Sequence, residues 1–68
     1  MKQLDLHGIT HANVHKELDG FFGVANFPVV IITGQSRRMK ELVAQIALGY
    51  GLKTKDTLAN PGRVVVYE

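Results

Sequence analysis

Pro28-Val29-Val30-Ile31-Ile32-Thr33-Gly34 is the stretch that decides the fold of this 68-residue chain. Its four consecutive β-branched apolar residues predict a strand in the middle of a sheet, covered on both faces. A glycine ends the strand, and a helix is expected over residues 37–48. The helix is predicted from apolar residues that recur at i, i+3, i+4, i+7 and i+8, namely Met39, Leu42, Val43, Ile46 and Ala47.

The segments on either side of this strand-helix pair predict four further elements. Alternating side chains indicate a first strand, and an apolar stripe ending near Phe22 or Gly23 indicates a first helix, with the Thr10 hydroxyl capping its first turn. Asn60-Pro61-Gly62 is a turn sequence that predicts a closing hairpin. The four elements are expected at residues 2–7 (strand), 10–22 (helix), 52–58 (strand) and 63–67 (strand).

The predicted order of elements, βαβαββ, indicates an α/β fold of the α+β two-layer type. We expect one domain over residues 1–68, with a four-stranded mixed sheet and both helices on one face. The other face then stays partly open. If Leu4 and Leu6 of the first strand face the helices, Asp5 and His7 face the open side.

The composition of the chain limits where it is expected to act and which kinds of partner it can have. The chain has no cysteine, and its longest apolar run, Val29–Ile32, is far too short to cross a membrane. A carboxylate at position 5 is unlike a secretory signal, so a cytoplasmic location is expected. Residues 33–68 have six Lys or Arg against three Asp or Glu, whereas residues 1–32 have two against three. A basic half points toward an anionic partner, but charge alone favours the simpler interpretation of solvated surface charge.

The first candidate site is Asp5 with His7. Side chains two apart in a strand point the same way, so a carboxylate and an imidazole would lie together where open α/β sheets bind ligands. His7 could then act as a general acid or base, and Asp5 could orient it or hold a metal ion. The alternative is an exposed acid beside a loop histidine.

The second candidate is the loop from Thr33 to the start of the second helix. Free backbone amides and the helix dipole favour an anion there, and cations at the same place repel the dipole by about 0.3–1 kcal/mol each. A bound phosphate would relieve that repulsion. The predicted binding residues are Gly34, Gln35, Ser36, Arg37, Arg38 and Lys40, together with Arg63 on the closing hairpin. Ser36 is expected either to cap the helix or to bind the phosphate. The alternative is that the long cationic side chains simply bend away into solvent.

Two weaker patterns remain. Lys53, Lys55 and Arg63 could form a basic strip along a nucleic-acid backbone, or could simply protect an edge strand from aggregation. The three histidines at positions 7, 11 and 15 raise the question of a metal site, but nothing in their spacing brings all three together, so no dedicated metal site is predicted.

Three segments resemble the Smr (small MutS-related) domain family. Leu4-Asp5-Leu6-His7-Gly8 is similar to its LDLHG signature, Ile31-Ile32-Thr33-Gly34-Gln35-Ser36 to a hydrophobic strand leading into TGxG, and residues 60–67 to its final turn and strand. Ser36 stands where the family has a second glycine, and Arg37-Arg38 follow in place of a glycine- and histidine-bearing stretch.

The resemblance implies a fold similar to the C-terminal domain of bacterial translation initiation factor three. It also implies binding of DNA or RNA, and endonuclease activity on structured substrates with Asp5 and His7 as catalytic residues. Such activity usually depends on a divalent metal ion, so Mg²⁺ is the candidate cofactor if the domain is catalytic. Two alternatives stay open. One is a non-catalytic module that binds nucleic acid or a phospho-ligand. The other is a protein-interaction module or homodimer that uses apolar side chains on the uncovered sheet face.

Overall fold

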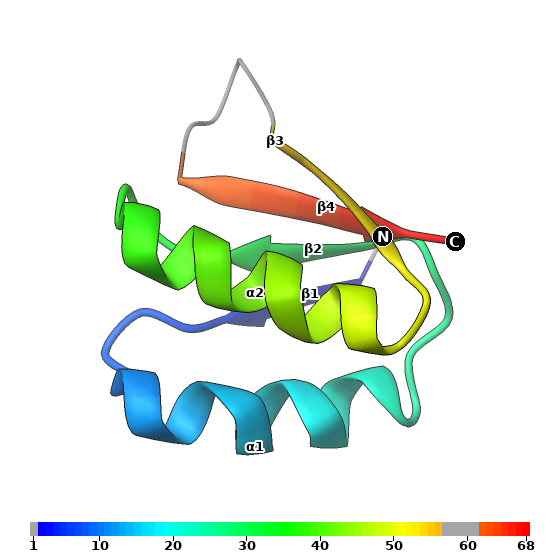
Figure 1. Ribbon diagram of the computed structural model, residues 1–68, viewed down its shortest axis with the longest axis horizontal. Helices are drawn as coiled ribbons and strands as arrows, with labels where there is room; N and C mark the ends of the chain where they lie inside the picture. The colour runs from blue at the N-terminus through cyan, green and yellow to red at the C-terminus, as the bar shows by residue number, and fades with distance from the viewer. Residues whose placement is uncertain (1, 57–61) are drawn as a thin grey trace.

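The computed structural model describes residues 2–56 and 62–68 (Figure 1). This part of the chain forms a small α+β domain with the predicted order of elements. The elements are β1 (Lys2–Asp5), α1 (His11–Phe22), β2 (Val29–Ile32), α2 (Arg37–Gly49), β3 (Lys53–Asp56) and β4 (Arg63–Tyr67). Neither helix is long and apolar enough to cross a membrane, as far as the described residues go.

The four strands form the predicted mixed sheet. Their order across the sheet is β1-β2-β4-β3. β1 and β2 are parallel, and β4 is antiparallel to both of its neighbours. β2 and β4 therefore occupy the centre, and β3 is an edge strand. The polar composition of β3, Lys-Thr-Lys-Asp, suits that edge position.

The core lies between the sheet and the two helices, which run side by side in Figure 1. α1 buries Val14, Leu18 and Phe22, and α2 buries Met39, Val43 and Ala47, so each helix contributes one stripe at four-residue spacing. These residues form a single cluster with the buried side chains of β2 and β4. Both helices thus cover the same face of the sheet.

The opposite face of the sheet is not covered by any described element. Along β2, Val29 and Ile31 are buried, whereas Val30 and Ile32 are only half-buried. β4 alternates in the same way, and the register pairs buried with buried residues and half-buried with half-buried ones. The prediction that the second strand is covered on both faces is therefore wrong, because both helices pack on one side.

Several predicted boundaries also need correction. β1 ends at Asp5 rather than at His7, and β3 ends at Asp56 within the described residues. The predicted extension to Thr57 and Leu58, and Asn60-Pro61 of the predicted turn, lie outside the described residues. Thr10 occupies the N-cap position of α1, but its hydroxyl does not cap the first turn as predicted: it accepts a hydrogen bond from the Asn13 side-chain amide (2.9 Å) and none from a backbone amide.

Candidate functional site

Three chain segments meet at the carboxyl end of the parallel strands, at the edge where α2 begins (Figure 1). The Leu6 amide donates to the Ile32 carbonyl (2.9 Å), which holds the end of β1 against the end of β2. The Gly34 amide donates to the Gly62 carbonyl (3.0 Å), which holds the loop after β2 against the start of β4. Ligands of open α/β sheets bind at this kind of edge.

A hydrogen bond links the Asp5 side chain to the backbone of His7. The Asp5 carboxylate, through Oδ1, accepts a hydrogen bond from the His7 backbone amide (2.8 Å), and both residues are exposed. His7 belongs to a turn in which Gly8 has φ +83° and the Ile9 amide donates to the Leu6 carbonyl (3.0 Å). The two-residue strand period therefore does not extend to His7, and it does not place this imidazole on the same strand face as Asp5.

The loop after β2 is fastened to the start of β4 by one carbonyl. The Gly62 carbonyl accepts from the Thr33 amide (2.8 Å), the Gly34 amide (3.0 Å) and the buried Thr33 hydroxyl (3.2 Å). A Cβ at Gly62 would stand 3.4 Å from the Gly34 Cα, so the two backbones are in close contact. The amides of Thr33 and Gly34 are thus already used, and an anion would have to bind the amides that follow them.

The start of α2 carries positive charge without local compensation by acids in its first turn. Ser36 is the N-cap, as predicted, and its Oγ accepts from the Met39 amide (3.1 Å). The amides of Arg37 and Arg38 have no partner inside the helix, as for the first residues of any α-helix. Both arginines are exposed, the first turn holds no acidic residue, and Arg38 lies 3.9 Å from Glu41.

A groove of about 570 Å³ lies between α2 and β3. It is lined by Gln35, Arg37, Lys40, Glu41, Ala44, Thr54, Asp56 and Val64. Three predicted binding residues therefore share one concave surface, but two carboxylates lie in it as well. Arg63 lies elsewhere: it pairs with Ile32, on the face of the sheet away from the helices.

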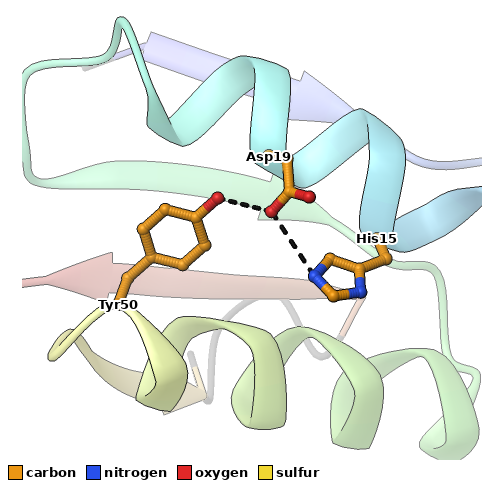
Figure 2. Close-up of polar contacts among 3 residues, drawn as sticks. All are labelled: His15, Asp19 and Tyr50. Atoms are coloured by element: carbon orange, nitrogen blue, oxygen red, sulfur yellow. Dashed lines mark hydrogen bonds and ion pairs between the residues drawn. The ribbon is translucent and has the colours of Figure 1, made fainter.

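A polar cluster between the helices was not predicted from the sequence (Figure 2). The Asp19 carboxylate accepts a hydrogen bond from the Tyr50 hydroxyl, and the same oxygen lies 3.5 Å from His15 Nε2. The hydrogen bond to Asp19, more than desolvation or charge, raises the pKa of Tyr50 above its usual value of 10.0. The four-residue spacing of His15 and Asp19 was visible in the sequence, but the approach of Tyr50 depends on helix packing.

The three histidines do not converge on a metal site. Within residues 2–56 and 62–68, no three His, Asp or Glu side chains are grouped closely enough to hold a metal ion. His11 and His15 both line a hollow of about 530 Å³ between the helices, with Asp19 and Tyr50. His7 is not part of that lining.

Comparisons with models of protein families, with curated proteins and with solved structures found no match to this chain.

Proposed function

We propose that this domain binds nucleic acid, with the phosphate backbone held at the start of α2. The observation that carries the proposal is the first turn of that helix, which holds Arg37, Arg38 and Lys40 and no acidic residue. Glu41, one residue beyond Lys40, lies 3.9 Å from Arg38 and offsets only part of this charge. Each cation at a helix N-terminus costs about 0.3–1 kcal/mol through repulsion by the helix dipole. A phosphate would reverse the sign of this interaction and accept paired hydrogen bonds from an arginine.

The surroundings support the same partner. The edge that holds these cations also holds the turn after β1 and the start of β4, so a backbone lying there would contact several segments at once. The exposed His7 and the cationic Arg63 flank that edge. A flexible polyanion with phosphates at regular spacing suits this arrangement better than a single small anion.

The salt dependence of binding tests the proposal. A fluorescent duplex and a fluorescent single strand are titrated with the wild-type chain and with the Arg37→Ala/Arg38→Ala variant over a series of salt concentrations. Loss of two phosphate contacts should flatten the slope of log K against log salt by about 1.8 for duplex DNA. Lys16→Ala, which removes an exposed cation in the middle of α1, is the matched control and should leave the slope unchanged. Equal slopes for all three proteins, or no binding by the wild type, would reject the site.

Cleavage by Asp5 and His7 is a second proposal, which rests on the resemblance to Smr domains. The Asp5 carboxylate uses one oxygen on the His7 amide, so its other oxygen remains to hold Mg²⁺ or to take up a proton. The exposed His7 imidazole would act as general acid or base on a bound phosphodiester.

Two variants at position 5 separate a catalytic carboxylate from a structural one. Asp5→Asn keeps an oxygen that can accept from the His7 amide, whereas Asp5→Ala removes it. Branched DNA and structured RNA are incubated with and without Mg²⁺. A catalytic role predicts that both variants, and His7→Gln, lose cleavage while binding persists. Cleavage by Asp5→Asn at the wild-type rate would show that the carboxylate serves only the turn, and no cleavage by the wild type would leave a binding module.

A further inference from the structure

The face of the sheet opposite the helices combines apolar, aromatic and basic side chains. The strand register places its residues in three rows across the sheet. Asp5, Ile32 and Arg63 form the row nearest the start of α2, and Gln3, Val30, Val65 and Lys55 form the next row. Tyr67 and Lys53 pair in the third row. We call this set of nine residues the open face.

The open face is apolar at its centre and basic along one side. Val30, Ile32, Val65 and Tyr67 are half-buried, and no described element lies over them. Three cations, Lys53, Lys55 and Arg63, accompany a single acid, Asp5, at the opposite edge of the sheet. One oxygen of that acid already accepts from the His7 amide. The face therefore carries a net positive charge around an apolar centre.

We infer that the open face binds the bases of single-stranded nucleic acid, with Tyr67 as a stacking platform. Proteins that bind single strands combine aromatic rings, on which bases stack, with cations that follow the phosphates. Tyr67 and Lys53 are directly opposed on neighbouring strands, so one ring and one charge are presented together. A duplex presents its phosphates outward and keeps its bases stacked inside, so it would not contact the apolar centre of the open face. A single strand exposes its bases, which can contact that centre.

This inference rests on the proposed function, because both require nucleic acid as the partner, and it specifies the class of substrate. Arg63 immediately follows Gly62, whose carbonyl accepts hydrogen bonds from the loop before α2. The open face therefore begins beside the proposed phosphate site at the start of α2. From Arg63 to Tyr67 the chain extends about 14 Å along β4. That length accommodates about four stacked nucleotides at roughly 3.4 Å each.

Tyrosine fluorescence gives a direct test. The chain has two tyrosines and no tryptophan, so Tyr50→Phe leaves Tyr67 as the only strong emitter. We expect an eight-nucleotide single strand to quench this emission, and an abasic strand of the same length and charge to bind without quenching. Tyr67→Leu should weaken binding of the single strand about 10-fold, a loss typical of removing one stacking ring, and leave duplex binding unchanged. Tyr67→Phe keeps the ring and should bind as the wild type does.

The outcomes separate this inference from the proposed function. Absence of all nucleic-acid binding by the wild type overturns both. Binding that responds to Arg37→Ala/Arg38→Ala but not to Tyr67→Leu, with no quenching, overturns the open-face inference and leaves the proposed function standing. Sedimentation that shows a dimer in the wild type and a monomer in Tyr67→Leu would also overturn it, because a second copy of the chain would then occupy the face.

Discussion

In the central strands β2 and β4, the two faces of the sheet carry similar β-branched side chains in different surroundings. Val64 and Val66 point toward the helices and are buried, while Val65 between them points away and is half-buried. Ile31 and Ile32 differ in the same way. The helices need only one apolar face to form the core. The apolar side chains on the other face are therefore not explained by packing within the described chain, and they are the natural candidates for contact with a partner.

The largest expected effect separates the two isoleucines. Ile31→Ala removes a side chain that is 0% exposed, and we expect it to lower the free energy of unfolding by about 2–5 kcal/mol. Ile32→Ala should cost about 1 kcal/mol, because this side chain is already partly in water. Urea unfolding followed by circular dichroism measures both values.

A domain of this size has a stability of only about 3–10 kcal/mol, so a milder pair of variants keeps the comparison measurable if Ile31→Ala does not fold. Ile31→Val has an expected loss of about 0.5–1.5 kcal/mol, and Ile32→Val should be close to neutral. Equal losses at positions 31 and 32 would mean that something covers the open face in solution.

A smaller effect is expected when shape is kept and only polarity changes. Val29→Thr places a hydroxyl in the core and should cost about 1–3 kcal/mol, because the new group loses water without gaining a defined partner. Val30→Thr makes the same change on the open face and should stay within about 0.5 kcal/mol. Thermal melts of the two variants compare them directly. A similar loss at both positions would contradict the assignment of the two faces.

Much of the fold could be predicted because its signals are local and periodic. The apolar stripe of α2, the β-branched run of β2 and the glycines between elements each depend on neighbouring residues, and together they indicated the observed order. The error at Val30 and Ile32 has a physical reason. A run of four apolar residues has no period, so it cannot show whether one face or two faces are covered.

The candidate site was harder to predict because its defining bonds join distant segments. Nothing in the sequence shows that the Gly62 carbonyl accepts hydrogen bonds from the amides of Thr33 and Gly34. The end of β1 at Asp5 was missed for a related reason: the carboxylate bonds forward to the His7 amide and turns the chain, which competes with continuing the strand. The N-cap at Ser36, by contrast, is a local feature and was predicted.

The loop after β2 should depend on backbone conformation rather than on packing. Gly34 has φ +66°, and a Cβ added there would have nothing within 4 Å, so Gly34→Ala should cost about 1–2 kcal/mol through backbone strain alone. Gly20→Ala is the matched control. It is equally unobstructed but lies inside α1, where alanine should stabilise by about 0.5–1 kcal/mol. Chemical denaturation should therefore give opposite signs, and the same sign for both would contradict the left-handed conformation at Gly34.

The smallest effect is expected at the polar cluster between the two helices. The Tyr50 hydroxyl must be protonated to donate to Asp19, and its pKa is raised in the folded chain by that bond. Its contribution to stability is therefore fully present below pH 10.0, the ordinary pKa, and is lost as the pH rises through the higher folded value. Tyr50→Phe has no hydroxyl to lose. Melting temperatures of wild type and Tyr50→Phe should differ slightly at about pH 8, and the difference should shrink as the pH rises above 10.0. A difference that persists unchanged at the higher pH would show that the ring, which also meets Phe22 edge to face, provides the stabilisation instead of the hydrogen bond.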